Sequence, residues 1–228
     1  MTRYPQFCAL ARAAELLGER WSLLIVRELL LGPRRFTDLR GGLDGVSTSV
    51  LAKRLADLER DGLVRRLEMG PPVAGTVYEL SEHGAALRPA IYELIRWGGR
   101  FLLPPRRGER FDPQWLLLAL AACARERDAP PHALQLLVAD QRRELAIHVA
   151  GGPSGTTVEA RLAPADLTIR GRARPVFELL TGIKKPAEAA AKGRLQLAGD
   201  RRLLEVAPRF FATSSRRPEN GEPAAPAE

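Results

Sequence analysis

The chain has 228 residues, enough for two modest domains that each bury a core of their own. Its 45% hydrophobic and 27% charged residues are ordinary for a soluble globular protein. The longest apolar stretch, from Trp115 to Ala122, is too short to span a bilayer, so we expect no membrane insertion. The net charge of +8 permits binding to nucleic acid but does not say where.

The first residues and the cysteine content indicate the compartment. The beginning of the chain contains no apolar signal-peptide core and carries Glu15, which argues against export. Only two cysteines occur, Cys8 and Cys123, and their spacing is not that of a paired motif. This content suits a reducing compartment without structural disulfides. We therefore expect a cytoplasmic protein.

Apolar periodicity predicts four helices in the first part of the chain. One is expected over Cys8–Leu17 and a second over Trp21–Leu31, where a Gly-Pro pair stops it. A third helix, Phe36–Leu43, is followed by a glycine-containing turn. A fourth helix is capped by Ser47, whose hydroxyl can satisfy an unpaired amide group, and runs to about Asp61.

A hairpin and a closing helix are expected next. Two strands, Leu63–Glu68 and Val77–Leu80, flank a wing rich in proline and glycine. Ser81 then opens a helix that Pro89 interrupts and that continues to about Phe101. Two helices joined by a turn and followed by a winged hairpin present one helix to the major groove of DNA. The sequence therefore predicts a winged helix-turn-helix.

The closing helix carries an apolar stripe that its own domain does not need. Ile91, Leu94, Ile95 and Trp97 lie along the stripe. A terminal helix has little core left to cover, so a stripe of this length indicates a partner subunit.

The second part of the chain alternates strands with short helices. Asp112-Pro113 opens a helix, and period-two alternation of apolar residues predicts strands after it. The expected elements in order are strands 133–138, 144–149, 157–162 and 167–169, helices 176–180 and 186–191, a strand 194–197 and a helix 201–211. This pattern is typical of an α+β fold, in which helices cover a sheet.

Composition breaks divide the chain into domains. The expected ranges are 1–101 for the winged helix-turn-helix that binds DNA and dimerises, 102–113 for a linker, 114–213 for a ligand-binding domain and 214–228 for a disordered tail.

Three segments carry a resemblance to a known family. They are CALARAAELLGERWSLLIVRELLLGPRRFTDLR, then GVSTSVLAKRLADLERDGLVRR, and YELSEHG with a closing Trp97-Gly98. With them, residues from about 8 to 98 resemble the HxlR-type winged-helix regulators. The resemblance implies a dimeric transcription regulator that binds double-stranded DNA, with the N-terminal and closing helices supplying the dimer contact.

Candidate DNA contacts follow from the placement of polar and basic residues. Leu51, Leu55 and Leu58 occupy one face of the recognition helix, which leaves its other faces for solvent or DNA. Hydroxyl and basic side chains there can bond base edges or phosphates. The wing segment Met69–Thr76 has no basic residue, so two arginines at its base are expected to serve the backbone instead. The candidates are Arg34, Arg35, Thr48, Ser49, Lys53, Arg54, Arg65 and Arg66.

A second resemblance covers residues from about 111 to 212. The run of four strands, ADLTIRG, FELLTGIKKPAEAAAKGRLQLAGD and the final helix are similar to those of sterol-carrier-protein-like domains. That family encloses an apolar tunnel, so the resemblance implies binding of an apolar small molecule or lipid. The candidate lining residues are Leu118, Val138, Ile147, Phe177 and Leu180.

No pattern in the sequence indicates catalysis. The three histidines lack ligand spacing, and neither a nucleophile elbow nor a phosphate-binding glycine loop occurs. We therefore expect no enzyme activity, no catalytic residue, no metal and no cofactor.

Three hypotheses remain. The first is a homodimeric repressor that binds a pseudo-palindromic operator and responds to an apolar ligand. The second is a regulator that senses oxidants or electrophiles through Cys8, whose thiolate a helix N-terminus and Arg12 would favour; burial as a small apolar residue is the alternative for this cysteine. The third is a lipid-binding protein whose winged helix does not bind DNA.

Overall fold

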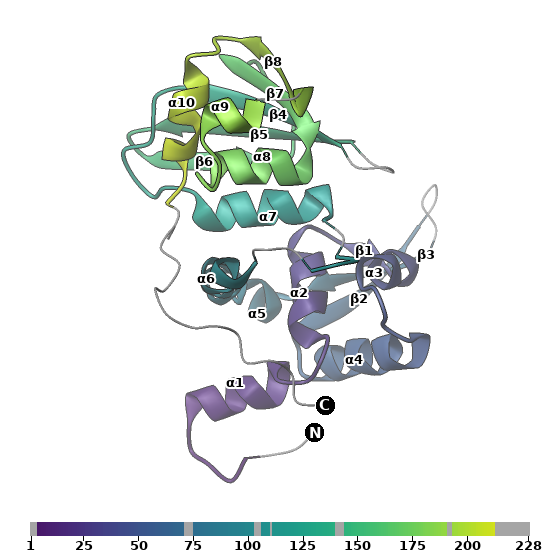
Figure 1. Cartoon of the computed structure of the whole chain (residues 1–228). Coiled ribbons are helices and arrows are strands. Elements are labelled where there is room, and N and C mark those ends of the chain that lie inside the picture. The colour runs from purple at the N-terminus through teal and green to yellow at the C-terminus, as the bar shows by residue number, and fades with distance from the viewer. Residues whose placement is uncertain are drawn as a thin grey trace. The chain divides into compact units, whose positions relative to one another are not determined.

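A computed structural model describes residues 4–70, 75–102, 106–109, 111–139, 144–190 and 193–212. The chain divides into two compact units, Met1–Ile91 and Tyr92–Glu228 (Figure 1). Both contain helices and strands, which confirms the expected mixture of α and β structure. The predicted domain ranges remain predictions. The wing residues 71–74 and the predicted tail lie outside the described residues.

The N-terminal unit begins with two helices close to their predicted places. Helix α1 spans Ala9–Leu17, with Cys8 as its N-cap. Helix α2 spans Ser22–Leu30, and its N-cap Trp21 has a φ of 81°, a conformation that bulky residues seldom adopt. Trp21 packs against the core of this unit, so tertiary contacts hold it there.

The helix-turn-helix pair follows. Helix α3 spans Phe36–Gly42 and helix α4 spans Thr48–Arg60. The hydroxyl oxygen of Ser47 accepts a hydrogen bond from the amide of Val50 at 3.3 Å, which confirms the predicted cap. The core of the unit combines apolar side chains from α2, α3, α4 and the strand that follows them. These are Ile25, Leu29, Leu39, Leu43, Leu51, Leu55, Leu58, Leu63 and Val64.

A three-stranded sheet completes the winged helix. Strand β2 (Val64–Met69) pairs antiparallel with β3 (Gly75–Leu80), as expected for the hairpin. A third strand, β1 (Arg34–Arg35), is not expected from the sequence and pairs with β3 on its other side. A strand of two residues is too short to leave a periodic signal.

The predicted closing helix is divided. Helix α5 spans Glu82–Ala85, and α6 spans Arg88–Gly98, followed by the 3₁₀ helix η1 over Gly99–Phe101. Pro89 occupies the second position of α6 instead of breaking a longer helix. A proline is tolerated there because first-turn amides have no partner within the helix.

The C-terminal unit contains a five-stranded sheet in the order β6-β5-β4-β7-β8. Strands β4 and β7 are parallel, and the other neighbours are antiparallel. Figure 1 shows helices α7, α8, α9 and α10 gathered on one face of the sheet. The elements in order are α7 (Pro113–Cys123), β4 (Ala133–Ala139), β5 (Glu144–Gly152), β6 (Gly155–Glu159), β7 (Leu167–Arg172), α8 (Ala173–Leu180), α9 (Pro186–Ala190), β8 (Leu195–Gly199), α10 (Leu203–Val206) and the 3₁₀ helix η3 (Ala207–Phe210).

Several elements of this unit have other bounds than predicted: β5 and β7 end three residues later, and α8 begins three residues earlier. The sequence predicts a strand over 157–162. The observed strand β6 begins earlier, at Gly155, and ends earlier, at Glu159. The single helix expected over 201–211 is α10 followed by η3, with Pro208 in the second position of η3. Proline has no amide hydrogen, so it cannot continue the α-helical hydrogen bonding.

Candidate nucleic-acid interface

Helix α4 exposes polar residues on its first two turns. Its buried face is fixed by Leu51, Leu55 and Leu58, which are 0–1% exposed. Thr48, Ser49 and Lys53 are all exposed, as are Ser47 and Val50 beside them. A helix whose N-terminal turns are free of packing can enter a major groove with these side chains toward the bases. The structure thus brings together three of the predicted contact residues.

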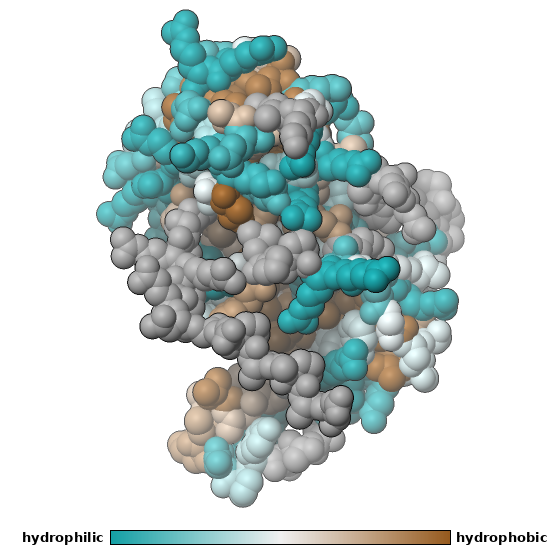
Figure 2. Space-filling model, in the orientation of Figure 1, coloured by the Kyte–Doolittle hydropathy of each residue, from teal (hydrophilic) through white to brown (hydrophobic). Residues whose placement is uncertain are grey.

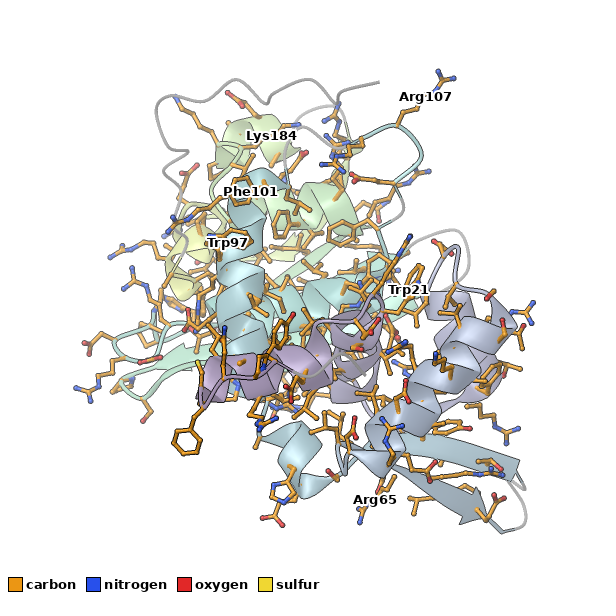
Figure 3. The ribbon with its side chains drawn as sticks, turned by 90° about the horizontal axis from the view of Figure 1, so that it is seen from below. Trp21, Arg65, Trp97, Phe101, Arg107 and Lys184 are labelled. Atoms are coloured by element: carbon orange, nitrogen blue, oxygen red, sulfur yellow. The ribbon has the colours of Figure 1, made fainter. Side chains whose placement is uncertain are left out.

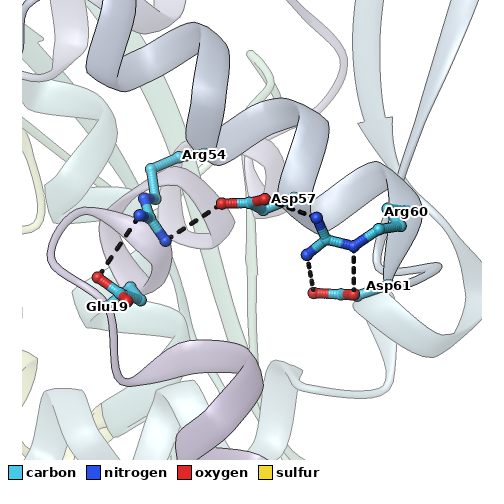
Figure 4. A network of polar contacts seen from close by, with 5 residues as sticks. All are labelled: Glu19, Arg54, Asp57, Arg60 and Asp61. Atoms are coloured by element: carbon cyan, nitrogen blue, oxygen red, sulfur yellow. Dashed lines mark hydrogen bonds and ion pairs between the residues drawn. The ribbon is translucent and has the colours of Figure 1, made fainter. Parts of the chain in front are cut away.

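Arg54 is engaged within the protein. Its guanidinium lies 3.5 Å from a carboxylate oxygen of Glu19 and 3.4 Å from one of Asp57, and only 13% of its side chain is exposed (Figure 4). Asp57 also accepts a hydrogen bond from Arg60 at 2.8 Å. This network ties α4 to the loop before α2, so substituting Arg54 would disturb that connection together with any DNA contact.

Arg40 is a further candidate for contact with DNA, beyond the residues predicted from the sequence. It is exposed on the last turn of α3, and its guanidinium donates a hydrogen bond to the hydroxyl of Thr48 at 3.4 Å. This contact places a cation beside the N-terminus of α4. The sequence could have indicated that Arg40 is exposed. It directly follows Leu39, which points inward, and neighbouring residues of a helix point in different directions.

Arg34 and Arg35 lie on β1, at the edge of the winged sheet. Arg35 is exposed and precedes α3, where its amide donates to the carboxylate of Asp38 at 3.2 Å. Arg34 is half-buried. The pairing of β1 with β3 therefore attaches both arginines to the wing as well as to the helix pair.

The arginines at the base of the wing are paired with carboxylates of the same sheet. Arg65 is exposed on β2 and forms an ion pair with Glu79 on β3 (Figure 3). Arg66 donates to Glu68 at 3.0 Å. The hydroxyl of Thr76 donates to Glu68 at 2.8 Å, and this bond holds the pKa of the carboxyl below its usual value. A phosphate would compete with these carboxylates for both arginines.

The predicted ligand-binding residues do not all share one location. Val138, Ile147 and Leu180 are fully buried in the apolar core of the C-terminal unit, and Phe177 packs against that core. Leu118 is also buried but is not part of this core. Leu116 and Leu120 are the fully buried residues of α7 in this core. Leu118 lies two positions from each of them, and residues at that spacing point to different sides of a helix.

The two cysteines have different surroundings. Cys8 is exposed at the N-cap of α1. Cys123 is half-buried at the end of α7, and burial raises the pKa of its thiol. A thiol with a raised pKa is a poor nucleophile at neutral pH. Cys123 therefore behaves as a packing residue.

Two further properties bear on function. Within the described ranges, no helix is long and apolar enough to cross a bilayer. In the same part of the chain, no three His, Cys, Asp or Glu side chains gather in a way that could hold a metal ion.

Comparison with known proteins identifies a family and several relatives. The family described as HxlR-like helix-turn-helix matches residues 16–105. The chain is 34% identical over 93 residues to the uncharacterized HTH-type transcriptional regulator YvaP of Bacillus subtilis (strain 168). The aligned region covers 41% of this chain and 86% of YvaP. It is 35% identical over 92 residues to the HTH-type transcriptional regulator YodB of the same organism, covering 40% of this chain and 82% of YodB. A solved structure, the reduced form of YodB, is 32% identical and covers 44% of this chain and 100% of that chain, with a TM-score of 0.38.

These relatives are named as transcriptional regulators and not as enzymes, which confirms the prediction that the chain is not an enzyme. The sterol-carrier-like assignment of the C-terminal unit remains a prediction.

Proposed function

The chain belongs to the HxlR-like helix-turn-helix family of DNA-binding transcription regulators, and from that premise we propose that it is a homodimeric repressor. Helix α4 would read bases of a pseudo-palindromic operator, one half-site for each protomer. We also propose that it works in the cytoplasm.

The exposed first turns of α4 carry this proposal. Thr48 and Ser49 offer hydroxyls that both donate and accept hydrogen bonds, and Lys53 offers a positive charge one turn further on. No described residue forms an ion pair with Lys53, whereas Arg54 beside it is paired twice. Lys53 can therefore bind a phosphate or a base without first breaking a contact inside the protein.

Apolar side chains exposed near α1 support a dimer. Tyr4, Phe7 and Leu10 are 45%, 111% and 77% exposed, and Figure 2 shows apolar residues on the surface over α1. Exposed apolar residues that gather on one element indicate a protein–protein contact.

The end of α6 presents a second surface of this kind. Trp97 and Phe101 are 61% and 63% exposed. Their rings pack edge to face, with 5.1 Å between the ring centroids (Figure 3). Large aromatic side chains are enriched at the centres of interfaces. We propose that α1 and α6 contribute to the contact between protomers.

Selection of bound sequences from random double-stranded DNA tests the proposed function. We expect a two-fold symmetric consensus whose half-sites are about one helical turn apart, roughly 10 base pairs from centre to centre. Affinity should fall steeply with salt, since phosphate contacts release counterions. Recovery of no consensus, with binding that ignores sequence, would contradict an operator-binding repressor and favour the lipid-binding alternative.

We further propose that an apolar molecule held in the C-terminal unit modulates DNA binding. The apolar side chains that the sheet and helices α7 and α8 direct into the core of this unit have the chemistry that such a ligand needs. Such a ligand shifts DNA affinity only by its different affinities for the two states of the protein. Gentle native mass spectrometry of the purified protein would reveal it as additional mass on the dimer.

The alternative in which Cys8 is the sensor is favoured by the exposure of that thiol at a helix N-cap. It predicts that a mild oxidant such as diamide releases the protein from its operator, and that Cys8→Ser abolishes the release. Cys123→Ser is the matched control and should still release. Equal release of DNA from wild-type protein and Cys8→Ser, measured by fluorescence anisotropy, would exclude this alternative.

A further inference from the structure

A cleft of about 400 Å³ lies in the C-terminal unit. It is lined by Arg125 and residues 128–132, from the segment that connects α7 to β4, together with Val206 of α10 and Arg209 of η3. Of these residues only Val206 packs against the apolar core. The cleft is therefore separate from the predicted lipid site. Its volume is within the range of small-molecule sites, about 300–1,000 Å³.

Backbone hydrogen bonds hold the wall of the cleft in place. The amide of Arg125 donates to the carbonyl of Phe210 at 3.1 Å, and the carbonyl of Arg125 accepts from the amide of Thr156 at 2.8 Å. The amide of Asp128, a residue with a φ of 52°, donates to the carbonyl of Pro153 at 3.2 Å. These bonds connect the segment to two other parts of the unit. A wall fixed in this way loses little entropy when it binds a ligand.

Two glycines let the β5–β6 hairpin approach this wall directly. A Cβ atom on Gly151 would lie 2.2 Å from the carbonyl oxygen of Pro130, and one on Gly155 would lie 2.4 Å from that of Arg125. Gly155 also has a φ of +100°. Only glycine permits backbones to approach so closely, so the shape of the cleft depends on these two positions.

Basic side chains at the cleft are available to a ligand. Arg125 and Arg209 are exposed, and in the part of the chain that the structure describes neither has a carboxylate within ion-pair distance. Arg161 and Arg170 of the same unit, in contrast, pair with Glu159 and Glu144. An unpaired guanidinium is a preferred partner for a carboxylate, which it can bind through two parallel hydrogen bonds.

The remaining lining sets the rest of the ligand's chemistry. Ala129, Pro130 and Val206 offer apolar surface, whereas Asp128 contributes an acceptor and His132 a ring that lies 3.6 Å from the carboxylate of Asp166. We infer that the cleft binds a small organic carboxylate, with its charge at Arg125 and Arg209 and its apolar body against the prolines. Asp128 can accept a hydrogen bond from a hydroxyl or amine on the same molecule. Use of the cleft as an effector site rests on the proposed function; binding itself does not.

Titration of the full chain in the absence of DNA tests the inference. The probes are benzoate, 2-hydroxybenzoate and hexanoate, with benzamide as the uncharged control. Binding is measured by calorimetry and by amide chemical shifts of labelled protein. We expect at least one carboxylate to bind saturably, with the largest shifts in residues 125–132 and at Arg209. The variant Arg125→Gln/Arg209→Gln should bind it about tenfold more weakly or worse.

The variant Arg172→Gln/Arg201→Gln is the matched control, because it removes two exposed arginines of the same unit from outside the cleft. It should bind the carboxylate as wild-type protein does. The inference is overturned if none of the three carboxylates binds, if benzamide binds as tightly as benzoate, or if Arg125→Gln/Arg209→Gln keeps its affinity. Since DNA is absent, these outcomes are independent of whether the protein recognises an operator.

Discussion

Replacing Thr48, Ser49 and Lys53 together with alanine is expected to abolish sequence-specific DNA binding while the fold stays intact. Each lost base contact costs about 1–3 kcal/mol, and a two-fold symmetric dimer loses every contact twice. Operator affinity should therefore fall by at least about a thousandfold, to that of non-specific DNA. The loss of Lys53 should also make the slope of log affinity against log salt concentration shallower, by about one phosphate contact for each protomer. Fluorescence anisotropy over a range of salt concentrations measures both effects.

The fold should survive because all three side chains are exposed and the cap residue Ser47 is retained. Thermal unfolding followed by circular dichroism checks this. The variant Ser154→Ala/Thr157→Ala/Lys185→Ala removes the same side-chain types from exposed positions of the C-terminal unit and should bind DNA normally. A folded α4 variant with unchanged operator affinity would remove the assignment of α4 as the recognition helix.

Introducing aspartate at Phe7 and Leu10 is expected to convert the proposed dimer to a monomer. Burying each of these side chains at an interface stabilises it by about 1.5–3 kcal/mol, and both protomers contribute, so the variant loses roughly 6 kcal/mol or more. Four buried carboxylates would add a desolvation cost. Sedimentation analysis should show one protomer mass at micromolar concentration. Operator binding should weaken strongly as well, because one protomer contacts only one half-site.

The variant Leu162→Asp/Ile183→Asp is the control for this substitution. Leu162 and Ile183 are 72% and 43% exposed in the C-terminal unit, so the control adds the same charge at exposed apolar positions away from α1. It should remain dimeric. If Phe7→Asp/Leu10→Asp also remains dimeric, α1 is not part of the interface, and Trp97→Asp/Phe101→Asp then tests α6 in the same assay.

The sequence alone determined where the recognition helix α4 lies and which of its faces is buried. The spacing of Leu51, Leu55 and Leu58 fixed which face of α4 is buried, and the hydroxyl of Ser47 fixed where the helix begins. These features are local, because a helix repeats every 3.6 residues and its cap involves residues only a few positions apart. For the same reason the sequence indicated that Thr48, Ser49 and Lys53 would be exposed.

Only the tertiary structure decided which of the other candidate DNA-binding residues are engaged in contacts within the protein. Arg54 meets Glu19 from the loop before α2, Arg65 meets Glu79 across the hairpin, and β1 becomes a strand because β3 passes beside it. The cleft at Arg125 and Arg209 likewise joins segments that are far apart in the chain. Ion pairs, sheet pairing and clefts depend on distances between such segments. Periodicity in the sequence reports the direction of a side chain, but not the group that it meets.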